Sequence, residues 1–465
     1  MIRSTSVVLA AIVAAAVASP SRSLLVAQAA AGPGAAAGAA VPDPKATTPA
    51  ACLDEVRAYV AARQSEAPAA AASDAAAVRA RNAALQQIAA GRTAMDRACA
   101  AKFDPKTIDA SQLLPLIQLD ADANQIDLAV VAVNRALALT SMAPADRASL
   151  LVTAISVVRR LTAPNADRPW RVANVYPKVE ALVDELDANA AATFAEKWSV
   201  HTTMESVYRG DDIDAGILKH GAWILAAARA FSPEERQRYG PAVVSAHVNM
   251  AEAYAGQNMT DKALALLTAA RTDWKDLPGI DARVDPTRHR YELVGTPAAP
   301  ILAAHWLNAP AGTTSLALPG KVTLLEFTAH WCGPCRESYP GINRLRERFA
   351  GGDFRVVMVT RLWGYFGSER NLPADAEIAH DRDYFAEHGL DVPVAIGEAR
   401  PASVVNGAVA YTNGQDPNDT AYRVNGIPQI QVIDANGTIR LIMVGYDNAN
   451  EAKLGAFIQT LLDRK

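Results

Sequence analysis

The stretch TLLEFTAHWCGPCRESYPGINRL, residues 323 to 345, holds two of the chain's four cysteines between an apolar run and a helix-like segment. The run predicts a buried strand, and Gly333-Pro334 suits the first turn of a helix, where a proline loses no intrahelical hydrogen bond. Cys332 would then lie at a strand-to-helix turn, where unpaired N–H groups and the helix dipole favour a thiolate. Cys335 follows one turn later, within bridging range, so the pair predicts a reactive dithiol.

Two other readings of this cysteine pair are disfavoured. A zinc site needs four ligands, but the other two cysteines are distant and isolated, and His330 alone does not complete the set. We therefore predict no metal, and we expect His330 to face solvent or substrate. A purely structural bridge is also disfavoured, because a loop this short constrains little of the unfolded chain.

The chain around this stretch alternates apolar strands with helical segments. VTLLEFT leads to a helix over about 332–349, followed by FRVVMVT, a helix over about 377–388, VPVAI, QIQVIDANGTIRLIMVG and a closing helix over about 449–462. Such alternation predicts a sheet with parallel members and helices on both faces, and the Asn436-Gly437 turn predicts an antiparallel hairpin at its end. We expect an α/β domain over residues 290–465.

Further residues of this domain have a predicted place beside the dithiol. Glu326 lies within an apolar strand, where a buried carboxyl is protonated near neutral pH and can exchange the proton of Cys335. Ile427-Pro428 directly precedes a strand, where a cis proline would expose backbone groups to an extended substrate. Trp331 is expected to form part of the substrate surface.

The Trp331-Cys332-Gly333-Pro334-Cys335 motif, Glu326, Pro340 and Ile427-Pro428 together resemble thioredoxin-fold proteins, closest to exported TlpA/ResA-type thiol-disulfide oxidoreductases. VGTPAAP and LPGKVTLLEF resemble the extra amino-terminal hairpin of that branch. The resemblance implies that Cys332 is the nucleophile, Cys335 the resolving thiol, Glu326 the buried acid and Pro428 the cis proline. It implies no cofactor.

Two segments depart from the pattern of that family. Residues 361–373, RLWGYFGSERNLP, and residues 398–419 lengthen the chain between the dithiol and Pro428 beyond a minimal thioredoxin. Each is either a lid over the substrate or a surface insertion.

An all-helical region is predicted over residues 52–285, since apolar residues recur three or four positions apart between Pro, Gly, Asn and Asp breaks. One tetratricopeptide-like helix pair fits residues 251–270, but no sustained repeat is found. The region is either a spacer or a docking surface for a partner protein.

Cys52 opens the first helix of this region and Cys99 ends the second, so an antiparallel pair could bridge them. We expect their ends to match only if Gly91 shortens the second helix or the first continues beyond Pro68. The alternatives to a structural disulfide are two buried thiols or a second redox pair.

The amino terminus has the features of a secretory signal over residues 1–29: Arg3, then an apolar run, then small residues. Residues 30–51 are predicted to be a disordered Ala/Gly/Pro linker. We therefore expect an exported, periplasmic protein, with an uncleaved membrane anchor as the alternative. The net charge of −4 gives no broad basic face for nucleic acid.

These features predict an exported thiol-disulfide oxidoreductase that reduces disulfides of client proteins. The resemblance implies a membrane electron donor of the DsbD/CcdA kind. Two alternatives stay open: a protein-interaction module in which the thioredoxin fold is passive, and a disulfide oxidase or isomerase.

Overall fold

The computed structural model describes residues 41–68, 75–161, 168–398, 403–405, 408–410, 416–446 and 448–464. The predicted signal at 1–29 and most of the predicted linker lie outside these residues. The chain forms two compact units, which divide between Val200 and His201. Among the described residues, no helix combines the length and apolar character needed to cross a bilayer.

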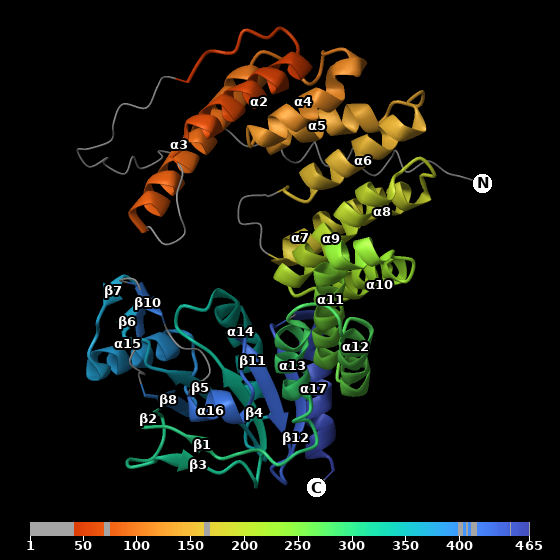
Figure 1. Cartoon of the computed structure of the whole chain (residues 1–465). Coiled ribbons are helices and arrows are strands. Elements are labelled where there is room, and N and C mark those ends of the chain that lie inside the picture. Colours follow the sequence, from red (N-terminus) through yellow and green to blue (C-terminus); the bar gives the residue numbers. More distant parts are fainter. Residues whose placement is uncertain are drawn as a thin grey trace. The chain divides into compact units, whose positions relative to one another are not determined.

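The first unit is helical. Its helices are α2 (Pro49–Glu66), α3 (Ala75–Ala100), the short 3-10 helix η2 (Ala110–Gln112), α4 (Leu113–Asp122), α5 (Ile126–Leu137), α6 (Pro144–Val158), α7 (Arg168–Asn174), α8 (Tyr176–Ala188) and the start of α9 (Phe194–Gly210) (Figure 1). The first of them begins where the sequence marks a start, with Thr48 as the cap and Pro49 in the first turn.

A disulfide joins Cys52 in α2 to Cys99 in α3, with 6.0 Å between their Cα atoms. Neither condition that we expected for this pairing is met, because α2 ends at Glu66 and α3 continues through Gly91. Instead α3 is the longer helix and its first turns extend past the end of α2. Gly91 helps the two helices approach, since a Cβ there would lie 2.2 Å from the hydroxyl oxygen of Tyr59.

The predicted linker differs from the structure at its end. Pro44 and Ala46 are buried, and the Lys102 ammonium donates hydrogen bonds to both of their carbonyl oxygens. The backbone N–H of Lys45 donates to Glu55 at 2.8 Å. Residues 41–48 therefore pack against the first helices, because Ala46 adds apolar surface to the cluster around Cys52 and Cys99.

The second unit begins at His201 and combines the last helices of the region predicted as all-helical, 52–285, with a sheet whose strands begin at Ile301. The helices are the rest of α9, then α10 (Asp214–Ala228), α11 (Pro233–Gly256), α12 (Thr260–Asp273) and α13 (Ile280–Tyr291). Partly buried ion pairs join them: Glu252 accepts from Arg290 at 3.0 Å and from Arg209 at 2.9 Å. The tetratricopeptide-like character of these helices stays a prediction.

These helices contact the sheet directly. Helix α11 packs on the edge strand β12, and the Asp212 carboxylate accepts a hydrogen bond from the backbone N–H of Tyr446 at 3.3 Å. A Cβ at Gly445 would lie 2.4 Å from the same carboxylate. This close approach joins the helices after His201 to the sheet.

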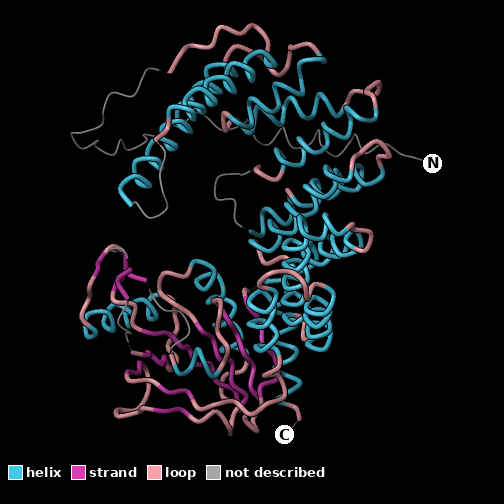
Figure 2. Tube along the Cα trace, in the orientation of Figure 1, coloured by secondary structure: helices cyan, strands magenta, loops and turns pink. Residues whose placement is uncertain are grey.

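The sheet has six strands in the order β12-β11-β4-β5-β8-β2. They are β2 (His305–Leu307), β4 (Val322–Phe327), β5 (Phe354–Arg361), β8 (Val394–Gly397), β11 (Gln429–Ile433) and β12 (Ile439–Val444). Strands β4, β5 and β8 are parallel, whereas β2, β11 and β12 run antiparallel to their neighbours. The mixed sheet and its closing hairpin at Asn436-Gly437 follow the prediction. All strands of the described residues lie after residue 300, and Figure 2 draws them in magenta.

Alternation along β4 decides which face each side chain occupies. Glu326 shares one face with Leu324, Ile430 and Val432, on which α14 (Gly333–Arg348), α15 (Ala374–Glu387) and α17 (Asn448–Leu462) contribute to a single apolar cluster. Phe327 lies on the other face, where its ring contacts Tyr422 beside α16 (Pro417–Ala421).

Three short antiparallel pairs complete the described structure: β1 (Ile301–Leu302) with β3 (Ser315–Leu316), β6 (Tyr365–Phe366) with β7 (Glu369–Arg370), and β9 (Ser403–Val405) with β10 (Ala408–Ala410). Residues 301–307, ILAAHWL, thus contain two short strands, β1 and β2, and only β2 joins the main sheet. The second segment that departs from the family pattern, residues 398–419, is described only in part, because residues 399–402, 406–407 and 411–415 lie outside the described residues.

Candidate active site

The dithiol lies where β4 turns into α14. Cys332 is the cap residue of this helix, with extended backbone angles, and Gly333-Pro334 form its first turn. The two sulfurs form a disulfide, S–S 2.07 Å, and the backbone N–H of Cys335 donates to the Cys332 sulfur at 3.2 Å. The amino end of the helix therefore directs both an N–H group and its dipole at Cys332, as a thiolate requires.

Access to the pair is narrower than the sequence suggested. Cys332 is 4% exposed and Cys335 0%, so the predicted reactive dithiol is largely covered, while the neighbouring Trp331 is 43% exposed. The reason is that both sulfurs belong to the apolar cluster beneath α14. What little surface the pair offers is on Cys332, which favours this sulfur as the attacking one.

Glu326 is fully buried beneath α14, and this burial raises the pKa of its carboxyl to about 8. Its Oε1 atom lies 2.8 Å from the hydroxyl of Ser338, which also lies 2.7 Å from the carbonyl oxygen of Cys335. One hydroxyl carries a single proton and cannot donate to both oxygens. With Glu326 protonated, both contacts are satisfied, since the acid donates to Ser338 and Ser338 donates to Cys335.

His330 does not face solvent or substrate, which corrects our expectation. It is buried, its ring lies 4.6 Å from that of Phe366, and its Nδ1 atom lies 3.7 Å from Asp381. Burial, and then the neighbouring His380, lower the pKa of His330 to about 4, so this contact is not an ion pair at neutral pH. Tyr365 and Phe366 of the insertion at 361–373 cover His330, and the sequence of the insertion alone did not reveal this contact.

The insertion at 361–373 is held in place by Glu377 of α15. Its two carboxylate oxygens accept from the backbone N–H groups of Trp363, at 2.6 Å, and Gly364, at 2.8 Å. The Arg361 guanidinium stacks over the Trp363 ring at 4.2 Å. The first part of the insertion is thus a fixed wall beside the dithiol.

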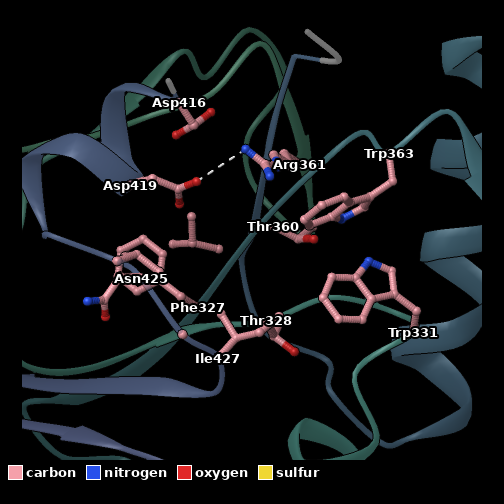
Figure 3. Close-up of a pocket in the computed structure, with 13 residues that line it drawn as sticks. Phe327, Thr328, Trp331, Thr360, Arg361, Trp363, Asp416, Asp419, Asn425 and Ile427 are labelled. Atoms are coloured by element: carbon pink, nitrogen blue, oxygen red, sulfur yellow. Dashed lines mark hydrogen bonds and ion pairs between the residues drawn. The ribbon is translucent and has the colours of Figure 1, made fainter. Parts of the chain in front are cut away.

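A pocket of about 540 Å³ opens beside this wall (Figure 3). Trp331 and Trp363 line one side, with ring centroids 5.0 Å apart, while Phe327 and Ile427 line the opposite side. The Ile427-Pro428 bond is cis, directly before β11. The structure thus gathers Trp331, Cys332 and Ile427 in one region, although they come from separate parts of the chain.

Comparisons with known proteins agree with this architecture. Residues 295–458 match the family model described as Redoxin. Thioredoxin H7 of Arabidopsis thaliana is 28% identical over 85 residues, 18% of this chain and 60% of that protein, and Thioredoxin H-type of Oryza sativa subsp. indica is 44% identical over 43 residues, 9% of this chain and 35% of that protein. The chain therefore spans less than two thirds of the length of either relative.

Two solved structures are each similar to about a third of this chain. A thiol-disulfide isomerase from Corynebacterium glutamicum shares 20% identity, covering 36% of this chain and 97% of that one, with a TM-score of 0.27. The thioredoxin domain of a thiol-disulfide oxidoreductase from Bacteroides vulgatus shares 15% identity, with coverage of 36% and 97% and a TM-score of 0.26.

The order of the elements and the Redoxin match show an all-helical region followed by a thioredoxin-like α/β domain, as the sequence predicted. The Redoxin match and the thioredoxin relatives support thiol-disulfide oxidoreductase activity for that domain. Among the described residues, no cluster of three or more His, Cys, Asp or Glu side chains could hold a metal ion.

Sequence reasoning missed three residues of this site: Ser338, Trp363 and Glu377. Ser338 lies one helical turn after Cys335, a spacing that could have suggested its position on the buried face. Nothing in the local sequence of Glu377 indicates that it holds residues 363 and 364, because this contact depends on the packing of α15.

Proposed function

We propose that this chain is an exported thiol-disulfide reductase of the TlpA/ResA type that acts on disulfides of client proteins. The observation that carries the proposal is the Cys332–Cys335 pair at the amino end of α14, with a buried carboxyl of raised pKa on the same face of the sheet. Cys332 is the nucleophile, Cys335 the resolving thiol and Glu326 the proton carrier.

In the reduced protein the Cys332 thiolate attacks one sulfur of the client disulfide and forms a mixed disulfide, and the other client sulfur leaves as a thiolate. Cys335 then loses its proton and attacks the Cys332 sulfur. The second client sulfur leaves, and the Cys332–Cys335 disulfide forms. Two electrons pass from the dithiol to the client.

Glu326 suits the proton transfer because a carboxyl with a pKa of about 8 exchanges its proton near neutral pH. Ser338 orients this carboxyl and connects it to the backbone of Cys335. Trp331, Ile427 and Pro428 are proposed to contact the client. A membrane donor of the DsbD/CcdA kind would return the protein to its reduced form in the periplasm.

Trapping and a redox titration together test this proposal. A Cys335→Ala variant should accumulate mixed disulfides with client proteins, whereas the Cys332→Ala/Cys335→Ala control should accumulate none. The reduction potential of the pair should lie near the thioredoxin value of about −270 mV, and a value near about −120 mV would instead indicate an oxidase. If neither variant traps a client, the enzymatic proposal fails and a passive interaction module is favoured.

Export is tested separately. Mass spectrometry of the protein recovered from the periplasm should find an amino terminus created by cleavage after Ala18 or Ala29, at the small-residue triplets of the signal. An intact Met1 in a membrane fraction would instead show an uncleaved anchor.

A further inference from the structure

The pocket beside the dithiol is formed by four separate segments of the second unit. They are the end of β4, the end of β5 with the start of the insertion, the start of α16, and the loop before Pro428. Trp331, which directly precedes Cys332, forms part of its wall. A client whose disulfide reaches Cys332 would therefore place a neighbouring residue at this pocket.

Trp331 itself calls for an explanation. The chain has seven tryptophans, all of them described, and Trp331 is the exposed one, at 43%. A large aromatic surface left open beside an apolar cavity typically marks a site that a partner covers. Its edge-to-face contact with Trp363 gives the cavity two aromatic walls at an interplanar angle of 85°.

The walls are fixed before any ligand binds. Glu377 holds the backbone of Trp363 through two hydrogen bonds, and Arg361 stacks on its ring. A preformed wall reduces the ordering entropy that binding would otherwise lose. This part of the insertion is therefore a binding surface rather than a lid that must close.

The charged groups at the pocket are already engaged. Arg361 pairs with Asp419 at 3.4 Å as well as stacking on Trp363 (Figure 3). Asp416 caps α16 by accepting from the backbone N–H of Asn418 at 2.8 Å. No described cation or anion in the pocket lacks such an interaction, and the remaining walls are largely apolar: Phe327, Val359, Val424 and Ile427.

We propose that this pocket binds a bulky apolar side chain, aromatic or long aliphatic, that lies next to the disulfide cysteine of the client. The proposal rests on the reductase function above and names the class of client that the enzyme prefers. The volume of about 540 Å³ lies within the range of specific ligand pockets and accepts one large side chain with part of its backbone. A charged side chain would lose its hydration without gaining a free partner.

The test uses the full-length reduced protein and a set of peptide disulfides that differ at one position beside the cysteine: Trp, Leu, Ala, Lys or Glu. We expect kcat/KM to be about 10- to 100-fold higher for the Trp and Leu peptides than for the Ala peptide, mainly through a lower KM. The Lys and Glu peptides should not exceed the Ala peptide. Equal rates for all five, or a preference for Lys or Glu, would overturn the inference.

Variants connect this preference to the pocket. In Trp363→Ala the ratio of the Trp peptide to the Ala peptide should fall below about threefold, and Trp363→Phe should restore most of it. Phe194→Ala, which removes an exposed aromatic side chain of the helical unit, should keep the full ratio. A Trp363→Ala protein that keeps the ratio would show that another surface selects the client.

Hydroxyethyl disulfide has no side chain to fill the pocket. Its reduction therefore tests the reductase function separately from the selectivity for an apolar side chain. If the wild-type protein reduces it but treats all peptides alike, the selectivity inference fails and the reductase function stands. If the protein reduces neither, the proposed function fails and the inference with it.

Discussion

The two disulfides of this chain lie in different surroundings. Cys52–Cys99 has both residues 0% exposed, joins two helices and closes a loop with a sequence separation of 47, whereas Cys332–Cys335 has a separation of three and leaves Cys332 4% exposed. In the second, the Cys332 sulfur lies at the amino end of α14, and the buried Glu326 contacts Ser338, which in turn contacts the backbone of Cys335. The first bridge therefore suits a structural role, whereas the proposed function requires the second to open and close.

Loop length accounts for much of this contrast. A bridge over a long loop removes much entropy from the unfolded chain, while a bridge between residues one helical turn apart removes little. A pair that adds little stability can be opened and closed without unfolding the domain. Replacing the cysteines of each disulfide in turn tests this difference between the two bridges.

The largest effect is expected for Cys332→Ser. Because the hydroxyl of serine does not attack a disulfide at neutral pH, reduction of client peptides should fall at least about 1,000-fold. A coupled assay of disulfide reduction measures it. The Cys52→Ser/Cys99→Ser protein is the matched control and should keep its rate within about twofold; a similar loss in both would erase the distinction between the bridges.

The second effect concerns stability rather than activity. Removing the long-loop bridge with Cys52→Ser/Cys99→Ser should lower the free energy of unfolding of the helical unit by about 4 kcal/mol on the chain-entropy model, given the separation of 47. Denaturant unfolding followed by circular dichroism measures the loss. The Cys332→Ser/Cys335→Ser protein should change far less, and an equal loss would mean that the short bridge is structural.

The third effect concerns Glu326, whose role in proton transfer can be measured while both cysteines stay in place. In the wild-type protein the resolving step should become faster near pH 8 as Glu326 ionises and can accept the proton. In Glu326→Gln this step should slow about 100-fold and lose that pH dependence, because no carboxyl remains to exchange the proton. Stopped-flow measurement of mixed-disulfide decay across pH 6 to about 9 checks this. A variant that keeps the wild-type pH profile would assign the proton transfer to another group.

The same variant has a stability signature with a defined sign. Between pH 4.5 and about pH 8 the folded chain keeps a proton on Glu326 that the unfolded chain has lost. The free energy of unfolding therefore falls as the pH rises through this range. The fall is on the order of 5 kcal/mol as an upper bound. Glu326→Gln should show a flatter pH dependence, with unfolding midpoints higher than wild type at pH 8.

Much of the site was predictable because it depends on local order. The spacing of Cys332 and Cys335, the strand before them and the acid at 326 are short-range features, and alternation along one strand already places Glu326 on a single face. The disulfide between α2 and α3 was only partly predictable. Cys52 and Cys99 were paired correctly, but the reason was wrong, since the second helix extends past the first rather than shortening at Gly91.

By itself, then, the sequence determined the alternation of strands and helices, the dithiol at a helix start and the buried acid, because periodicity, capping and burial of charge act between near neighbours. Only the tertiary structure decided that His330 is covered, that Glu377 fixes Trp363, and that the sheet and the helices after His201 form one unit. These features depend on contacts between residues far apart in the chain, and no local pattern specifies which side chains such packing brings together.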